Sequence, residues 1–283
     1  MNLIDGKLVS SMIKNALKEE VNSLFLNNGK KPKLAVILVG NNPASLIYIR
    51  RKQKMCEAIG IDFIDISLPE SSLEIDVVDQ IEKLSADQSI DGILVQLPLP
   101  EGLDKAFIIS HIPSDKDVDG LTSKNIASLY NNQDGIFPCT AVGVMDLLSF
   151  YNISLTGKRV CIIGRSLLVG KPLSLMMINA NATVTLCHSK TTNLSSITKE
   201  SDIIVAALGR PLFVTKEMVK PGAVVIDVGI NRLEDGNIVG DVDFTNVKEV
   251  ASYISPVPGG CGPMTVIELM KNTIKCYKIH NKQ

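Results

Sequence analysis

The sequence lacks several features that would place it in a specialised class of protein. It has no apolar run long enough to span a bilayer, and its first residues show neither the apolar core of a signal peptide nor the arginine content of a transit peptide. Its six cysteines are scattered and include no Cys-x-x-Cys pair, which argues against structural zinc and for a reducing compartment. We therefore expect a cytoplasmic protein without a membrane contact or a metal site.

An excess of charge of either sign is also missing. The 29 Lys and Arg residues nearly balance the 30 Asp and Glu residues, and the formal net charge is -1. Basic residues cluster only locally, at 30–33 and 50–54, as they often do on solvated surfaces. We therefore expect no nucleic-acid partner. With 283 residues, 45% of them hydrophobic, the chain is large enough for one or two well-packed domains.

Apolar runs and helical patterns alternate along the first half of the chain. Helical spacing appears at 8–25, after Pro43 and at 73–84, continuous apolar runs at 34–39 and 92–97, and a strand-like alternation at 61–68. Continuous apolar runs are typical of strands covered on both faces, and the alternation at 61–68 is typical of a strand nearer a sheet edge. Alternating strands and helices predict a parallel sheet with crossover helices.

The predicted helix that follows Pro43 carries a polar residue at an unexpected place. No further Pro or Gly occurs until Gly60, and helical spacing puts Tyr48, Lys52 and several apolar residues on one stripe. An ammonium on a buried face loses hydration, which disfavours its charged form and suits acid/base chemistry. The alternative is a lysine whose stem covers apolar surface while its amine reaches water.

Two polar features follow in the next part of the chain. The strand at 92–97 runs into prolines, so Gln96 is expected at the carboxyl edge of the sheet, where open α/β sheets bind ligands and where it can meet Lys52. Alternatively, Gln96 only forms hydrogen bonds with unpaired backbone groups at the end of the strand. The aspartate-rich segment 111–121 starts like a calcium loop but lacks the glycine position and the distant glutamate of an EF-hand, so a ligand-binding carboxylate is the better interpretation.

The chain changes character near residues 137–140 and begins a second series of strands and helices. Strands are predicted at 159–163, 182–187, 202–207 and 223–227, with helices at 141–150 and 172–179, which amounts to half or more of a doubly wound nucleotide-binding sheet. The loop at 164–172 has neither the Gly-x-Gly-x-x-Gly fingerprint nor a Walker A pattern. A glycine-bracketed loop between a strand and a helix still favours an anion, with a simple tight turn as the alternative.

The second strand of this series helps to distinguish the nucleotide. An NAD site would place Asp or Glu roughly 20 residues further on, to bond the ribose hydroxyls. Here the strand ends in His188-Ser189-Lys190, without an acid. A hydroxyl and cations at that point, together with Arg165 in the loop, suit the extra phosphate of NADP. His188 lies at the adenosine end, which argues against a role as catalytic base.

Five motifs occur together in the chain. They are Asn42-Pro-Ala-Ser-x-x-Tyr48-x-x-x-Lys52, Val95-Gln-Leu-Pro-Leu-Pro100, Lys116-Asp-Val-Asp-Gly120, Gly164-Arg-Ser-x-x-Val-Gly-Lys-Pro172 and Pro256-Val-Pro-Gly-Gly-x-Gly-Pro-Met-Thr265. In this order they give the chain a close resemblance to the bifunctional methylenetetrahydrofolate dehydrogenase/methenyltetrahydrofolate cyclohydrolase family over essentially its whole length. The chain departs from the family pattern at Ala141, where proline is usual, and at Cys261, where a small aliphatic residue is common.

The resemblance implies an α/β protein with two domains. Residues 1–138 would form an N-terminal α/β catalytic domain that binds folate, and residues 139–262 a Rossmann-like, doubly wound NADP-binding domain. The C-terminal helix, within 263–283, would return to pack on the N-terminal domain. The resemblance also implies that the folate lies between the two domains and that the protein is a homodimer.

The resemblance further implies roles for single residues. Lys52 would be the central acid/base group, oriented by Gln96, with Tyr48 stacking on the folate, Asp119 anchoring the pterin and Ser45 assisting nearby. Further substrate contacts are expected from Pro256, Gly259, Gly260 and Thr265. The expected NADP contacts are Gly164, Arg165, Ser166, Val169, Gly170, Pro172, His188, Ser189 and Ile230.

The implied function belongs to one-carbon metabolism of tetrahydrofolate derivatives. NADP-dependent oxidation of 5,10-methylenetetrahydrofolate would give 5,10-methenyltetrahydrofolate, and hydrolysis of that product would give 10-formyltetrahydrofolate. The alternatives are a monofunctional dehydrogenase of the same family, another two-domain NADP oxidoreductase acting on a small hydroxy acid, and a non-catalytic dinucleotide-binding module. The hydroxy-acid enzyme would explain residues 157–230 equally well, but it gives Tyr48, Gln96 and Asp119 no joint role.

Overall fold

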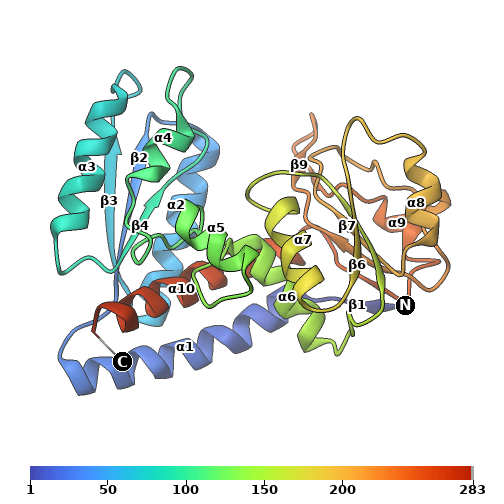
Figure 1. The fold of residues 1–283 in the computed structure, drawn as a ribbon, viewed down its shortest axis with the longest axis horizontal. Coiled ribbons are helices and arrows are strands. Elements are labelled where there is room, and N and C mark those ends of the chain that lie inside the picture. The colour runs from blue at the N-terminus through green and yellow to red at the C-terminus, as the bar shows by residue number, and fades with distance from the viewer. Residues whose placement is uncertain (282–283) are drawn as a thin grey trace. The chain divides into compact units, whose positions relative to one another are not determined.

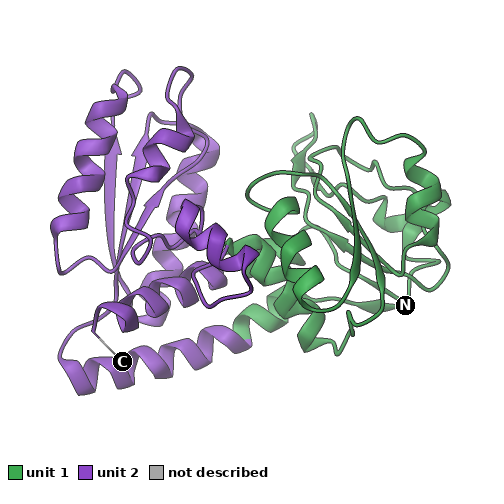
Figure 2. Cartoon of the chain, in the orientation of Figure 1, with its two compact units in different colours: residues 1–11, 138–265 green, residues 12–137, 266–283 purple. Residues whose placement is uncertain are grey.

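The computed structural model describes residues 1–281, which divide into two compact units (Figures 1 and 2). Unit 1 comprises residues 1–11 and 138–265, and unit 2 comprises residues 12–137 and 266–281. Neither unit is continuous in the sequence, because helices α1 (Gly6–Asn28) and α10 (Cys261–His280) each begin in unit 1 and end in unit 2. Within residues 1–281, no helix combines the length and the apolar character needed to cross a membrane.

Unit 1 is built on a six-stranded sheet in which all neighbouring strands are parallel (Figure 1). The strand order is β1-β11-β8-β7-β5-β6. The strands are β1 (Asn2–Leu3), β5 (Arg159–Ile163), β6 (Thr183–Cys187), β7 (Ile203–Ala206), β8 (Val224–Asp227) and β11 (Tyr253–Ile254). From β5 the chain moves first to β6 on one side and then to β7 and β8 on the other, which is the doubly wound arrangement predicted from the sequence.

Helices cover both faces of this sheet. On one face lie α8 (Leu194–Glu200), the 3-10 helix η1 (Lys216–Met218) and α9 (Phe244–Val247), next to a buried cluster that includes Cys161, Ile204 and Val225. On the other face, α6 (Cys139–Phe150) and α7 (Gly170–Asn179) pack together (Figure 1). A short antiparallel ribbon, β9 (Asn231–Arg232) and β10 (Ile238–Val239), follows β8.

Unit 2 contains a three-stranded parallel sheet in the order β3-β2-β4 (Figure 1). The strands are β2 (Lys33–Val39), β3 (Asp62–Leu68) and β4 (Gly92–Val95). The central strand β2 is buried from Leu34 to Val39, whereas β3 at the edge alternates between exposed and half-buried residues. Both patterns agree with the sequence prediction of a covered strand and an edge strand.

The two faces of this sheet are also covered by helices. Helices α3 (Glu74–Ala86) and α4 (Lys105–Ser110) contribute to a buried cluster with Ile37 and Ile93 on one face. On the opposite face, Thr273 of α10 lies close to Gly92. The sulfur atoms of Cys56, in α2 (Pro43–Ile59), and Met270, in α10, are 3.4 Å apart. Helix α5 (Ser123–Tyr130) precedes the crossing into unit 1.

Helix α1 buries only some of its apolar residues. Its range agrees with the predicted helix, but Leu8 and Met12 are 51% and 54% exposed, while Val9, Leu17 and Val21 are buried. Apolar residues occur on more than one side of this helix. Helical spacing therefore predicted that the segment is a helix, but not which side packs against the core.

Candidate active site

Helix α2 carries three of the predicted site residues, and local sequence explains both of its ends. Pro43 occupies the first turn, and the side chain of Asn42 accepts hydrogen bonds from the N–H groups of Ala44 and Ser45 at 3.0 and 3.2 Å. The helix ends at Gly60, whose φ of 96° suits a residue without a Cβ. The fully buried residues of α2 all belong to the predicted stripe and are Ser45, Ile49, Cys56 and Ile59.

The structure brings Lys52 and Gln96 together. The Nζ atom of Lys52 donates a hydrogen bond of 2.7 Å to Oε1 of Gln96. The Nε2 atom of Gln96 donates to the carbonyl of Leu97 at 2.6 Å, and the Gln96 residue is only 8% exposed. Because the amide nitrogen is already engaged, the oxygen is the end that faces the lysine. Lys52 itself is half-buried, so its amine is held at one place rather than extended into water.

Tyr48 and Ser45 lie one and two turns before Lys52 on the same helix. Tyr48 is half-buried, and the guanidinium carbon of Arg51 lies 5.8 Å from the centre of its ring. The hydroxyl of Ser45 is buried and has no hydrogen-bond partner among residues 1–281. A buried hydroxyl without a partner is unfavourable, so Ser45 is suited to bonding a ligand that enters this site.

Asp119 belongs to a segment that runs beside β4. The N–H group of Ile93 donates to the carbonyl of Lys116 at 2.7 Å, and Asp117 forms a parallel bridge with Ile93. The N–H group of Gly120 donates to the carbonyl of Asp117 at 3.2 Å, so the chain turns directly after this bridge, and Asp119 lies in the turn.

The two aspartates of this segment have different surroundings. The buried carboxylate of Asp117 accepts hydrogen bonds from the N–H group of Thr122 at 2.7 Å and from Nδ2 of Asn125 at 3.0 Å. Asp117 therefore closes the turn that leads into α5. Asp119 is half-buried, and of the two it is the residue suited to contacting a ligand.

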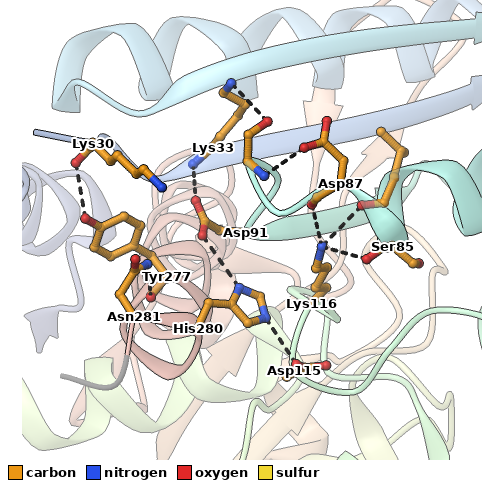
Figure 3. Close-up of polar contacts among 12 residues, drawn as sticks. Lys30, Lys33, Ser85, Asp87, Asp91, Asp115, Lys116, Tyr277, His280 and Asn281 are labelled. Atoms are coloured by element: carbon orange, nitrogen blue, oxygen red, sulfur yellow. Dashed lines mark hydrogen bonds and ion pairs between the residues drawn. The ribbon is translucent and has the colours of Figure 1, made fainter. Parts of the chain in front are cut away.

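Lys116 attaches the same segment to helix α3 (Figure 3). This lysine is 5% exposed, and its Nζ atom donates to the carbonyls of Leu84, Ser85 and Asp87 at 3.2, 2.9 and 2.8 Å. A cation is favourable at this position because the carbonyls at a helix C-terminus carry partial negative charge. Burial lowers the pKa of Lys116, and the nearby carboxylates, Asp115 first among them, oppose that shift.

The last turn of α10 contacts the segment from another side (Figure 3). The Nε2 atom of His280 lies 3.1 Å from a carboxylate oxygen of Asp115, and its Nδ1 atom lies 3.6 Å from one of Asp91. The other oxygen of Asp91 accepts the N–H group of Lys33 at 2.9 Å. Burial raises the pKa of Asp91, while its hydrogen bonds to Lys33 and His280 act in the opposite direction.

In unit 1, the predicted NADP residues lie at the carboxyl ends of neighbouring strands. The register pairs Ile163 with Cys187 and with Ala206, and Ala206 in turn with Asp227. The loops that follow β5, β6, β7 and β8 therefore leave the sheet at one level. Strand β5 lies between β6 and β7, where the strand order reverses, and doubly wound sheets bind their ligands at this point.

The loop that follows β5 is closely packed. Gly164 has a φ of 126°, and a Cβ atom there would overlap the carbonyl of Ala207. A Cβ at Gly170 would overlap the carbonyl of Gly164, and Gly170 begins helix α7, in whose first turn Pro172 is buried. Backbone N–H groups at such a helix start fit a phosphate. The other predicted residues of this loop are the exposed Arg165 and Ser166 and the half-buried Val169.

The ends of β6 and β8 differ in polarity. The N–H group of His188 donates to Oγ1 of Thr191 at 2.8 Å, and Nδ1 of His188 accepts the N–H group of Lys190 at 3.1 Å. Ser189 is exposed in this turn. After β8, Ile230 is 48% exposed, which places an apolar side chain at the same edge of the sheet. The end of β6 is therefore polar, and the end of β8 exposes an apolar side chain.

The loop at 256–265 is also well ordered within unit 1. Gly260 donates its N–H group to the carbonyl of Pro256 at 2.8 Å, and the carbonyl of Gly259 accepts an N–H group from the start of α1 at 3.1 Å. Both glycines are buried, and the hydroxyls of Thr265 and Thr140 are 3.0 Å apart. The N-terminus of α1 therefore holds this glycine-rich loop in place.

The two departures from the family motifs are both buried positions. Ala141 is 0% exposed in α6, and Cys261 is 4% exposed at the first position of α10. Burial raises the pKa of the Cys261 thiol above its ordinary value, and the nearby Asp227 adds to this effect. A thiol that stays protonated is a poor nucleophile, so Cys261 behaves as a small apolar residue.

The loop that follows β7 and Asp241, the residue that holds it, were not predicted from the sequence. The buried carboxylate of Asp241 accepts the N–H groups of Leu208, Gly209 and Arg210. These contacts join positions 31 to 33 residues apart in the chain. The short Gly-Asp sequence at 240–241 is also common in exposed turns, so no local signal pointed to it.

Comparisons with known proteins cover both halves of the chain. The family described as "Tetrahydrofolate dehydrogenase/cyclohydrolase, catalytic domain" matches residues 4–119. The family described as "Tetrahydrofolate dehydrogenase/cyclohydrolase, NAD(P)-binding domain" matches residues 138–281.

Individual relatives match the chain over nearly its full length. "Bifunctional protein FolD" of Rickettsia bellii is 49% identical over 281 residues, which is 99% of each protein. The crystal structure of the bifunctional FolD methylenetetrahydrofolate dehydrogenase/cyclohydrolase from Campylobacter jejuni has a TM-score of 0.97 at 48% identity and 100% coverage of both chains. The enzyme of Trypanosoma brucei, in complex with NADP cofactor and inhibitor, has a TM-score of 0.96 at 37% identity, with 99% of this chain and 98% of that chain covered.

Proposed function

The chain belongs to the tetrahydrofolate dehydrogenase/cyclohydrolase family, and on this basis we propose how its own residues perform the two reactions of that family. The protein oxidises 5,10-methylenetetrahydrofolate to 5,10-methenyltetrahydrofolate with NADP as cofactor. It then hydrolyses the methenyl compound to 10-formyltetrahydrofolate.

The alternative functions are not favoured. An NADP oxidoreductase for a small hydroxy acid, or a module that only binds a dinucleotide, does not account for the match of residues 4–119 to the catalytic-domain family. A monofunctional dehydrogenase is disfavoured because the full-length relatives in Rickettsia bellii and Campylobacter hominis are named bifunctional proteins.

The observation that carries the proposed mechanism is the hydrogen bond of 2.7 Å from Lys52 Nζ to Gln96 Oε1. In the hydrolysis, the oxygen of a water molecule bonds to the methenyl carbon, and the proton that it loses passes to the neutral amine of Lys52. As the bond from that carbon to N5 of the folate then breaks, N5 takes the electron pair and gains a proton, and the new hydroxyl loses its proton to become the formyl oxygen. A cationic substrate next to Lys52 disfavours the charged amine, which makes the neutral form available as a base.

In the oxidation, the contribution of the chain is alignment of the reactants. NADP, when bound, supplies the acceptor for the hydride that leaves the methylene carbon of the folate. Tyr48 offers an aromatic face for stacking, and Asp119 offers a carboxylate to the N–H groups of the pterin. Ser45 adds a hydroxyl that has no partner within residues 1–281.

Residues that would hold NADP lie in unit 1. The backbone at Gly164 and Gly170 would receive a phosphate, and Arg165 and Ser189 would bond the additional phosphate that distinguishes NADP from NAD. The tight packing of both glycines, which leaves no space for a Cβ atom, fits a backbone that approaches a ligand closely. The exposed, apolar side chain of Ile230 would contact the nicotinamide end.

The test uses two assays on one purified sample. Oxidation is followed with NADP and with NAD, and hydrolysis of 5,10-methenyltetrahydrofolate is followed separately without any nicotinamide cofactor. We expect both reactions, and faster oxidation with NADP. The variant Lys52→Met should slow hydrolysis by about 10²–10⁴-fold, the range for loss of a general acid/base, and slow oxidation less.

Lys54→Met is the matched control for this experiment. Lys54 is exposed on the same helix, so its replacement should leave both rates unchanged. Hydrolysis at the wild-type rate in Lys52→Met would mean that another group moves the proton. Absence of hydrolysis in the wild-type protein would instead leave only the dehydrogenase.

The assembly and the compartment of the protein are part of the same proposal. A cytoplasmic homodimer is in keeping with the family resemblance, and all six cysteines are free and buried, as expected in a reducing compartment. The net charge of -1 offers no attraction to nucleic acid. Light scattering after size exclusion measures the mass in solution, and a mass near 30.6 kDa, that of one chain, would contradict the dimer.

A further inference from the structure

Asp241 is a buried carboxylate surrounded by backbone donors. The residue is 0% exposed and follows β10 in unit 1. It accepts hydrogen bonds from the N–H groups of Leu208 at 2.7 Å, Gly209 at 3.0 Å and Arg210 at 2.9 Å. Three successive N–H groups that converge on one carboxylate fix the loop that follows β7.

The same carboxylate also contacts the loop that follows β8. Nδ2 of Asn231 donates to Asp241 at 2.9 Å. A Cβ atom at Gly229 would overlap the carboxyl group of Asp241, so the backbone of this loop lies directly against it. Asp241 therefore joins two loops that leave neighbouring strands at the same level of the sheet.

Asp227, the last residue of β8, supports this arrangement from the other side. One of its oxygens accepts the N–H groups of Gly229 at 3.0 Å and Asp241 at 2.9 Å, and the other accepts the N–H group of Val242 at 2.9 Å. A Cβ atom at Gly240 would overlap the Asp227 carboxylate. Asp227 thus packs against Gly240, which precedes Asp241, and Asp241 packs against Gly229, which lies two residues after Asp227.

Neither aspartate is placed to touch a ligand, because Asp227 and Asp241 are 2% and 0% exposed. The loops that they hold are accessible, since Gly209, Arg210 and Ile230 are all exposed. These loops lie on the β7 and β8 side of the reversal point, whereas Gly164 and His188 follow β5 and β6. An NADP molecule whose phosphates lie over β5 and β6 extends its nicotinamide half toward β7 and β8.

We propose that Asp241, supported by Asp227, is a positioning residue for NADP, holding the loops at 208–210 and 229–231 in the shape that receives the nicotinamide half. The role requires a carboxylate. In Asp241→Asn one acceptor oxygen becomes an NH2 group, which would face an N–H donor, so at least one loop loses its attachment. This inference uses NADP binding but none of the roles proposed for Lys52 or Gln96, so each can fail without the other.

A merely structural role for Asp241 would have different consequences. Loss of packing in unit 1 would lower the melting temperature and reduce both reactions together. Loss of loop positioning weakens NADP binding in particular, whereas hydrolysis needs no nicotinamide cofactor and its acid/base pair lies in unit 2. The ratio of the two effects therefore separates the explanations.

The experiment compares Asp241→Asn with Asp243→Asn in the full-length protein. Asp243→Asn removes the same charge two residues away, but within residues 1–281 the Asp243 carboxylate accepts hydrogen bonds only from Asn246 of α9. The readouts are the dissociation constant of NADP measured by calorimetry without folate, the hydrolysis rate without NADP, and the melting temperature. For Asp241→Asn we expect NADP binding to weaken tenfold or more, with hydrolysis within twofold of wild type, and for Asp243→Asn no change in either.

Unchanged NADP affinity in Asp241→Asn would overturn the proposal, and so would equal losses of NADP binding and hydrolysis. If Asp241→Asn does not fold, Asn231→Ala decides, since it removes only the contact to the second loop and leaves the charge in place. A threefold or larger increase in the NADP dissociation constant, with unchanged hydrolysis, would support the proposal. An unchanged constant in that variant would overturn it.

Discussion

The Nζ atom of Lys52 lies 2.7 Å from Oε1 of Gln96, and the nitrogen of the same amide is held by the carbonyl of Leu97. This polarity has a chemical consequence. An amide oxygen accepts a hydrogen bond from a neutral amine as well as from an ammonium, whereas a carboxylate strongly favours the ammonium. Gln96 therefore orients Lys52 without preventing the loss of its proton.

The variant Gln96→Glu should hold Lys52 in its charged form. A carboxylate in place of the amide raises the pKa of the ammonium, and each unit of increase costs about tenfold in the neutral fraction. We expect hydrolysis to be slow near pH 7 and to recover as the pH rises. The measurement is the pH–rate profile, corrected for uncatalysed hydrolysis, and a profile that is lowered without being displaced to higher pH would contradict the explanation.

Ser45→Ala should separate stability from substrate binding. The buried hydroxyl has no partner within residues 1–281, so its removal should leave the free energy of unfolding unchanged or increase it by about 1 kcal/mol. The KM for the folate should rise if the hydroxyl bonds the substrate. Ser85→Ala is the control, because the Ser85 hydroxyl already donates to the carbonyl of Ile81 at 2.6 Å. Lower stability with an unchanged KM would be the opposite of this expectation.

Lys116→Met should destabilise unit 2 and the segment that carries Asp119. Three carbonyls at the end of α3 lose their donor, and a charge-assisted hydrogen bond is worth about 1.5–3 kcal/mol. We expect urea unfolding to show a loss of about 3 kcal/mol, and the KM for folate to rise more than kcat falls. Lys124→Met, an exposed change in α5, should have neither effect. A stable variant with a normal KM would show that the attachment is dispensable.

Arg165→Ala should weaken NADP more than NAD. The additional phosphate of NADP gains a charge-assisted contact from the guanidinium, whereas NAD has no group there. We expect a loss of about tenfold in NADP affinity, equivalent to about 1.4 kcal/mol, and little change for NAD. Arg159→Ala, at the opposite end of β5 and paired with Glu200 at 3.4 Å, is the control. Equal losses for both nucleotides would exclude Arg165 as the phosphate contact.

The stability of the protein should depend on pH through Asp227. Burial raises its pKa to about 7, although the hydrogen bonds from Asp241 and Val242 act in the opposite direction. Between the ordinary aspartate pKa and about 7, the folded protein keeps a proton that the unfolded chain releases. The free energy of unfolding therefore falls as the pH rises through that window, by at most about 1.4 kcal/mol per pH unit, and the contribution is flat above it.

Urea unfolding of the wild type and of Asp227→Asn, measured from pH 4.5 to 8, isolates this contribution. The variant keeps an acceptor oxygen but cannot titrate, so the free energy of unfolding of the wild type minus that of the variant should fall as the pH rises to about 7 and then stay constant. A difference that does not vary with pH would mean that Asp227 is charged throughout.

Much of the fold follows from local patterns in the sequence. The buried stripe of α2 and the strands β2, β5 and β7 could be predicted from the residues of each element alone, because side-chain periodicity indicates which side of an element is covered. The contact between Lys52 and Gln96 could also be predicted, since both residues belong to elements at the carboxyl edge of one parallel sheet. A rule of topology was enough to bring two distant residues together.

Other features depend on contacts between distant segments and left no local trace. Strands β1 and β11 have two residues each, too few to show a period, and they exist because they pair with each other. The buried side of α1 is chosen by its tertiary partners, not by its own apolar residues. The local sequence around Asp241 is typical of a turn, and its role is evident only from the hydrogen bonds that it accepts from the loop at 208–210.

Because residues 266–281 belong to unit 2, that unit is assembled from two segments of the chain that are separated by residues 138–265. During synthesis, Cys56 and Gly92 emerge long before Met270 and Thr273, which cover them in the finished protein. At a rate of about 5–20 residues per second, the ribosome needs roughly 7 to 30 s to make the stretch from residue 137 to 281. During that interval the nascent first half exposes the apolar surface that α10 covers in the finished protein. We therefore expect its need for a chaperone to be greatest then.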